Sequence, residues 1–217
     1  GFNTDAYGFL ASLRDVRPDW KSGAGPVVVL GAGGASRAVV VALLDDGAKE
    51  IRLLNRTKER AEELARIDPS KVTVEDWEKR NAALDGAALL VNTTSQGMVG
   101  YPTLDISLDA LPKAPTVCDI VYNPLETPLL AAARKRGNAA IDGLGMLLHQ
   151  AVPAFEAFYG VRPAVSNDSP PPSSSKSTTS RSRPSPTSGR RRAIPRRSST
   201  TSTTRTAPTR GRCRTGR

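Results

Sequence analysis

Residues 26–65 read PVVVLGAGGASRAVVVALLDDGAKEIRLLNRTKERAEELA, and this segment constrains the fold more than any other. The run at 27–30 is continuously apolar, as expected of a parallel strand that is buried on both faces. A glycine turn and an apolar helical stretch follow; the helix begins near Gly34, and Gly47 is well placed to end it. A second apolar run at 51–55 completes a βαβ unit.

The same alternation continues along the chain. It predicts a helix at 58–66, strands at 88–92 and 117–122, a helix at 128–136 and a short last strand at 139–141. Strands that alternate with helices favour a doubly wound, Rossmann-like, mostly parallel sheet over a sandwich or a bundle. The fold class is therefore α/β.

Two further helical segments flank this region. One is DAYGFLASLRDV at 5–16, and the other is MLLHQAVPAFEAFYG at 146–160, which we expect Pro153 to interrupt. We expect the two helices to pack together outside the sheet.

The C-terminal segment differs in composition from the rest. Residues 1–168 contain 18 Lys and Arg against 21 Asp and Glu, whereas 169–217 contain 13 Lys and Arg and no acid. Ile194 is the only large apolar residue after Asp168, so this tail cannot bury a core and is expected to be disordered. Two interpretations stay open: an altered reading frame, or a basic arm that binds nucleic acid through phosphate charge.

Cysteine usage and hydropathy bound the cellular context. Cys118 and Cys213 lie on either side of the predicted boundary, so no disulfide framework is indicated. No run approaches the roughly 20 apolar residues of a membrane span, and the N-terminal residues do not resemble a signal peptide. We therefore expect a cytoplasmic protein without a membrane association, and no metal site is predicted.

The turn GAGGAS at 31–36 lies after a strand and opens a helix, as a dinucleotide fingerprint does. Gly31 would permit the tight turn, and Gly33 would let backbone amides approach a pyrophosphate at the positive end of the helix. Ser36 stands where the fingerprint has its third glycine. The alternative is a tight turn that binds no ligand.

The end of the second strand indicates which dinucleotide is bound. NAD-binding sites carry an acid about 20 residues after the glycines, but this chain has Asn55, Arg56 and Thr57 there, with Arg60 a turn later. Two guanidiniums and a hydroxyl suit the 2′-phosphate of NADP. Alternatively, Asn55 and Thr57 cap the next helix while both arginines are solvated.

Six motifs resemble shikimate dehydrogenase in order and spacing. They are GFNTDAYGF (1–9), VLGAGGASRAVV (29–40), NRTKERAEELA (55–65), VNTTSQGM (91–98), DIVYNPLETPLL (119–130) and DGLGMLLHQAVPAF (142–155). The resemblance implies reversible, NADP-dependent reduction of 3-dehydroshikimate to shikimate in aromatic amino-acid biosynthesis. Two alternatives remain: a quinate/shikimate dehydrogenase that uses NAD, or a non-catalytic nucleotide-binding fragment.

The resemblance also assigns roles residue by residue. It implies that Asp5 is catalytic and contacts the substrate, together with Tyr122 and Gln150. The cofactor-binding residues that it implies are Gly31, Ala32, Gly33, Gly34, Ala35, Asn55, Arg56, Thr57, Arg60, Ile120 and Gly143. Each substrate residue has a plain structural alternative, since Thr4 and Asp5 could cap a helix, Tyr122 could end a strand and Gln150 could lie on a helix surface. His149 is expected to be non-catalytic, because it points about 100° away from its neighbour Gln150.

The resemblance divides the chain into four segments. Residues 1–25 are expected to be the end of a substrate domain with its connecting helix, and 26–142 the NADP-binding domain. Residues 143–168 are expected to form a helix that packs back toward the substrate domain, and 169–217 the tail. The family's catalytic Lys matches no segment here, so little dehydrogenase activity is expected from these residues alone.

Overall fold

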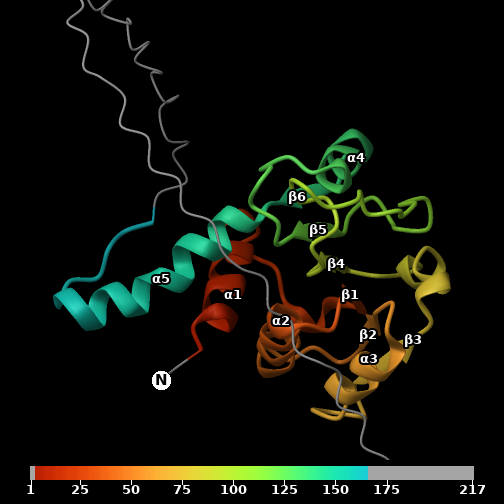
Figure 1. Cartoon of the computed structure of the whole chain (residues 1–217), viewed down its shortest axis with the longest axis horizontal. Helices are drawn as coiled ribbons and strands as arrows, with labels where there is room; N and C mark the ends of the chain where they lie inside the picture. The colour runs from red at the N-terminus through yellow and green to blue at the C-terminus, as the bar shows by residue number, and fades with distance from the viewer. Residues whose placement is uncertain (1–2, 166–217) are drawn as a thin grey trace, which may run out of the picture. The chain divides into compact units, whose positions relative to one another are not determined.

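Six parallel strands form one sheet at the centre of the described residues, which in this computed structural model are 3–165 (Figure 1). The strands are β1 (Val27–Leu30), β2 (Ile51–Leu54), β3 (Val72–Glu75), β4 (Leu89–Asn92), β5 (Thr116–Asp119) and β6 (Ala139–Ile141). Their order is β3-β2-β1-β4-β5-β6, and every neighbouring pair is parallel. This order is that of a doubly wound Rossmann-like sheet, which confirms the predicted fold class. The predicted disordered tail lies outside the described residues.

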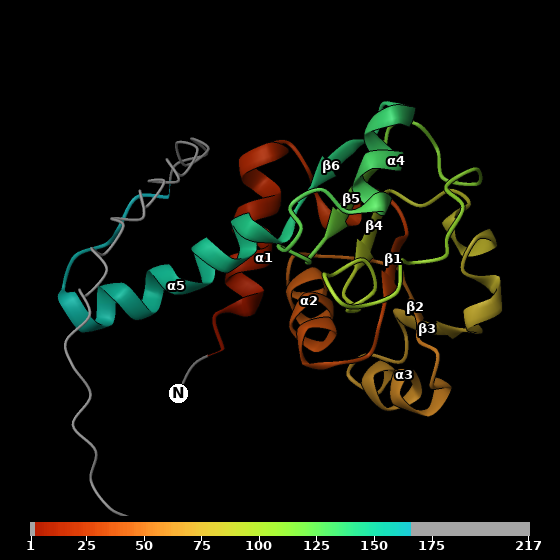
Figure 2. The same cartoon turned by 45° about the horizontal axis from the view of Figure 1, so that its top comes forward.

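Helices cover both faces of this sheet (Figure 2). They are α1 (Asp5–Val16), α2 (Gly34–Asp45), α3 (Lys58–Ala65), α4 (Pro128–Arg136) and α5 (Gly143–Tyr159), with short 3-10 turns at Ser22–Ala24, Trp77–Lys79 and Ala82–Leu84. None of the described helices is long and apolar enough to cross a lipid bilayer.

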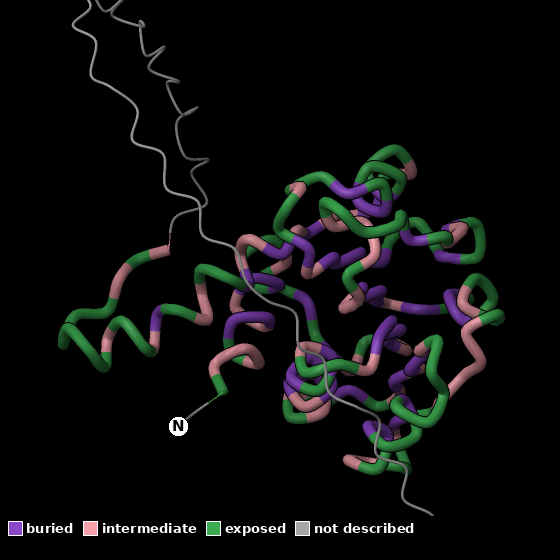
Figure 3. Tube along the Cα trace, in the orientation of Figure 1, coloured by how far each residue is buried: buried purple, intermediate pink, exposed green. Residues whose placement is uncertain are grey.

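Two apolar clusters, one on each face, explain why β1 has no polar residue. Val27 and Val29 pack with side chains of α1, α2, α3 and α5, whereas Val28 and Leu30 pack with α4 and the 104–111 segment. All four β1 side chains are completely buried (Figure 3). A polar side chain at any of them would lose its hydration without a partner, which is why the strand is continuously apolar.

The α1 and α5 helices pack against one another, as expected (Figure 1). Small residues make the crossing close: a Cβ added at Gly8 would lie 2.7 Å from the carbonyl oxygen of Met146, and one at Gly145 would overlap the Ser12 hydroxyl. At the far side of the crossing, His149 Nε2 lies 2.5 Å from Asp15 Oδ2. The two helices therefore contact each other nearly backbone to backbone.

The structure differs from the sequence-based predictions at three places. The β3 strand was missed. The β5 strand ends at Asp119 rather than at residue 122, because the next free amide, that of Val121, donates to the Asp119 carboxylate and not to a neighbouring strand. Pro153 does not interrupt α5, which runs through it as one helix. The buried side chains of Met146 and Val152 hold the segment before Pro153 in place, which offsets the hydrogen bond that proline removes.

Candidate functional site

The candidate site lies at the carboxyl ends of β1 and β4, where the chain order across the sheet reverses. From β1 the chain moves outward to β2 and β3, then returns to the other side of β1 as β4. The connections that leave β1 and β4 therefore diverge, and this opens a crevice in which doubly wound proteins bind their ligands.

The turn after β1 is held by hydroxyl groups. Gly31 has a φ of +111°, and a Cβ there would lie 2.6 Å from Thr93 Oγ1. Thr93 Oγ1 donates to the Leu30 carbonyl at 2.6 Å and lies 2.5 Å from Ser36 Oγ, which accepts from the Gly33 amide at 3.2 Å. The single proton of Ser36 is thus directed at Thr93. Ser36 at the third fingerprint position is completely buried and joins α2 to the end of β4.

The glycines at the start of α2 face open space. Gly33 and Gly34 are exposed, and a Cβ at either would meet no atom within 4 Å. The first amides of an α-helix have no intrahelical acceptor and carry the positive end of the helix dipole. A diphosphate can therefore approach the backbone here, between Ala32 and Ala35, without steric hindrance.

The segment after β2 presents two free guanidiniums. Asn55 Nδ2 donates to the Thr57 carbonyl at 2.7 Å and folds the turn that precedes α3. Thr57 is the N-cap residue of α3, but its side chain accepts no capping hydrogen bond. Arg56 and Arg60 are exposed and form no ion pair with any other described residue.

Lys58, between these arginines, is already engaged. Its Nζ lies 2.7 Å from Asp76 Oδ1, just after β3, and this contact raises the pKa of Lys58 and lowers that of Asp76. The free positive charge at the end of β2 is therefore that of Arg56 and Arg60.

A buried polar cluster joins the ends of β4 and β5. Asp119 Oδ1 accepts from Asn92 Nδ2 at 3.0 Å and from the Val121 amide at 3.2 Å, and Asp119 Oδ2 accepts from Thr127 Oγ1 at 2.7 Å. Burial raises the pKa of the Asp119 carboxyl, while these three hydrogen bonds act in the opposite direction. Sequence reasoning missed this cluster, although the polar residues that end two buried strands were a usable signal.

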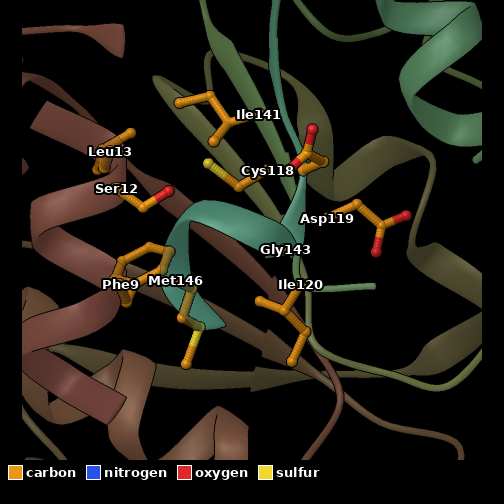
Figure 4. Close-up of a pocket in the computed structure, with 10 residues that line it drawn as sticks. Phe9, Ser12, Leu13, Cys118, Asp119, Ile120, Ile141, Gly143 and Met146 are labelled. Carbon is orange, nitrogen blue, oxygen red and sulfur yellow. The ribbon is translucent and has the colours of Figure 1, made fainter. Parts of the chain in front are cut away.

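The loop after β5 holds the start of α5. The Gly143 amide donates to the Val121 carbonyl at 3.0 Å, and a Cβ at Gly143 would overlap the Ile120 carbonyl. Figure 4 shows Gly143 directly beside Ile120 at the first turn of α5. Ile120 and Gly143, which the family resemblance assigns to the nicotinamide side of the cofactor site, are therefore in contact.

Behind this contact lies a void of about 10 Å³ between α1, α5 and β5 (Figure 4). It has room for about one water molecule, and most of its lining is apolar. Cys118 borders it, and burial raises the pKa of this thiol, which makes it unreactive. The void is a packing defect, not a ligand site.

The three candidate substrate residues come from different elements. Asp5 is the first residue of α1, and its amide donates to Asn3 Oδ1 at 2.8 Å; the Thr4 side chain makes no capping bond. Gln150 lies on α5 against α1, since a Cβ at Gly8 would be 2.9 Å from its Cβ. Tyr122 is half exposed in the loop after β5. The crossing of α1 and α5 therefore brings Gln150 one helical turn from Asp5 along the face of α1.

Comparison with known proteins agrees with this architecture. The family model for shikimate/quinate 5-dehydrogenase matches residues 19–99. The shikimate dehydrogenase (NADP(+)) of Paramagnetospirillum magneticum is 59% identical over 167 residues, which are 77% of this chain and 60% of that protein. That of Rhodospirillum rubrum is 56% identical over 169 residues, 76% of this chain and 60% of the relative. The chain thus spans about 60% of the length of these curated relatives.

Solved structures show the same relationship. A quinate dehydrogenase of Corynebacterium glutamicum in complex with NAD superposes with a TM-score of 0.70 at 36% identity, over 76% of this chain and 59% of that one. A shikimate 5-dehydrogenase of Thermus thermophilus in complex with NADP(H) and shikimate gives a TM-score of 0.64 at 36% identity, with the same coverage. The six ordered motifs, the strand order and these similarities agree, and over about three quarters of its length the chain is similar to shikimate dehydrogenases.

Proposed function

We propose that this chain supplies the NADP-binding part of a shikimate dehydrogenase, which reversibly reduces 3-dehydroshikimate to shikimate. One observation carries the proposal: an exposed glycine turn at a helix N-terminus lies beside a strand end that carries two unpaired guanidiniums and no acid. Similarity to relatives named for NADP(+) supports it.

The residues present fit this cofactor. Gly31, Ala32, Gly33, Gly34 and Ala35 would accept the diphosphate through backbone amides. Asn55, Arg56, Thr57 and Arg60 would bind the adenosine 2′-phosphate, because guanidiniums match phosphate geometry with paired donors. Ile120 and Gly143 would contact the nicotinamide end through backbone groups. When bound, the cofactor supplies the hydride.

The substrate is expected at the crossing of α1 and α5. Asp5 would be the carboxylate of the proton-transfer pair, and Gln150 and Tyr122 would contact the substrate hydroxyls. We propose that the rest of the substrate site belongs to the part of the relatives that these residues do not match.

The outer surface of α5 is the proposed contact for that part. Leu148 and Phe155 are half exposed, and Phe158 is largely exposed, so this face is unusually apolar for solvent. Residues 1–25 and 143–168 would then belong functionally with the substrate domain, and 26–142 with the cofactor. Little shikimate turnover is expected unless the matching domain is added.

The test is calorimetric titration of the chain with NADP(H) and with NAD(H). We expect NADP(H) to bind about a hundredfold more tightly or more, the contribution of two charge-assisted contacts to the 2′-phosphate. A preference for NAD(H) would instead support a quinate-type enzyme, which the similarity to the NAD-bound quinate dehydrogenase makes the second candidate. Absence of binding to either cofactor would contradict the proposal.

Gly33→Val should abolish NADP(H) binding while leaving the fold intact. Gly33 has φ −98° and ψ −167°, a conformation that valine adopts readily, and its Cβ would point into open space. The side chain would occupy the volume that the diphosphate needs. Thermal unfolding should therefore be nearly unchanged, while calorimetry shows at least a hundredfold weaker binding, the cost of several lost charge-assisted bonds. Unchanged affinity would mean that the diphosphate lies elsewhere.

A further inference from the structure

Asp119 is the only Asp or Glu side chain that is fully buried among residues 3–165, with 1% of its surface exposed. It forms no ion pair with any described residue. Its three hydrogen bonds are all received, from Asn92, Val121 and Thr127. The amide groups of Asn92 and Val121 can only donate, so Asp119 Oδ1, which accepts from both, carries no proton, and the Thr127 hydroxyl donates to Oδ2. This arrangement suits an ionised carboxylate.

An unpaired buried carboxylate is costly, and three neutral donors offset only part of that cost. A structural role alone does not require the charge, because the oxygen of a neutral amide could still accept from Asn92 and Val121 and join β4 to the loop after β5. Groups of this kind concentrate at functional sites. Asp119 lies at the carboxyl edge of the sheet, in register with Asn92, and directly precedes Ile120.

The carboxylate also controls the loop on the nicotinamide side. It binds the Val121 amide, and the carbonyl of that residue accepts the amide of Gly143. Figure 4 shows the Asp119 side chain on the opposite side of β5 from Cys118, and therefore away from the packed α1–α5 side. The negative charge of Asp119 therefore lies at the start of the loop that follows β5, which would line the nicotinamide end of the crevice.

We propose that Asp119 is a positioning residue whose negative charge favours the oxidised, positively charged nicotinamide over the reduced, neutral ring. This inference rests on the proposed function. The charge acts through space from beneath the loop, without contacting the ring. A buried charge keeps much of its field because water and salt screen it little.

The test compares the dissociation constants of NADP⁺ and NADPH for the whole chain and for Asp119→Asn. The substitution keeps the shape and removes the charge, so NADP⁺ should weaken about tenfold relative to NADPH, the scale of one charge interaction in a protein interior. Thr127→Val is the matched control, since it removes the hydrogen bonds of Thr127 Oγ1 to the Asp119 carboxylate and from the Leu130 amide but keeps the charge. It should change both constants by the same factor.

If the ratio of the two dissociation constants in Asp119→Asn differs from that of the unsubstituted chain by less than about twofold, rather than by the tenfold expected for one charge, the inference is overturned. The proposed function would then stand. Failure of the unsubstituted chain to bind either cofactor would overturn both. Should Asp119→Asn not fold, carboxyl carbon NMR of the unsubstituted chain decides. The pKa of Asp119 should be lower in the NADP⁺ complex than in the NADPH complex, and equal values would contradict the charge interaction.

Discussion

Replacing both Arg56 and Arg60 by alanine should lower the affinity for NADPH by about a hundredfold or more and leave the affinity for NADH nearly unchanged. Each substitution would remove one charge-assisted contact with the 2′-phosphate, and such a contact contributes roughly 1.5–3 kcal/mol. NADH has no such phosphate, so the loss is confined to NADPH. Fluorescence titration of the two reduced cofactors measures the difference directly.

Lys58→Ala is the matched control, because it removes a third positive charge from the same segment. Since Lys58 is paired with Asp76 at 2.7 Å, its loss should weaken NADPH binding only a few-fold. Equal effects of Lys58 and the arginine pair would show that general positive charge, and not the two unpaired guanidiniums, recognises the phosphate.

Gly143→Ala should be among the most destabilising single substitutions in this chain. The added methyl group would overlap the Ile120 carbonyl and approach the Val121 carbonyl carbon to 2.9 Å, so α5 would have to shift away from the loop. Such overpacking against backbone costs about 3 kcal/mol or more. The melting temperature should therefore fall by roughly 10 °C, given 2–4 °C per kcal/mol for a domain of this size.

Gly34→Ala provides the comparison. A Cβ at Gly34 meets no atom within 4 Å, and alanine favours helical structure by up to about 1 kcal/mol, so the melting temperature should hold or rise. If Gly143→Ala melted at the same temperature as the unsubstituted chain, the close contact between α5 and the β5 loop would be wrong.

Much of the fold follows from local pattern, and β1 with α2 shows why. Four consecutive apolar residues, a glycine turn and a helical apolar stretch have one common solution, a buried strand with its crossover helix. The placement of the glycine turn at the switch point of the sheet follows from that topology. The β3 strand was missed because it lies at the sheet edge, where Thr73 is exposed and the apolar pattern is weak.

The ends of β5 and α5 depended on contacts between distant residues. The β5 strand ends at Asp119 because the carboxylate accepts from the Val121 amide, and Asn92 and Thr127, which lie 27 and 8 residues away, hold that carboxylate in place. Pro153 leaves α5 continuous because packing against α1 offsets its cost. Neither contact can be predicted from the local sequence. The contact between Ser36 and Thr93 can likewise be predicted only once the order of the strands in the sheet is known.

The near-backbone contact between α1 and α5 limits how these helices can move. If one helix slid by a turn along the other, Gly8 would leave its close contact with Met146 and Gln150, and Gly145 its contact with Ser12, a displacement that tightly packed helices resist. Asp5 and Gln150 therefore keep their mutual spacing, and α1 and α5 have to move together as one rigid unit whenever the crevice opens or closes.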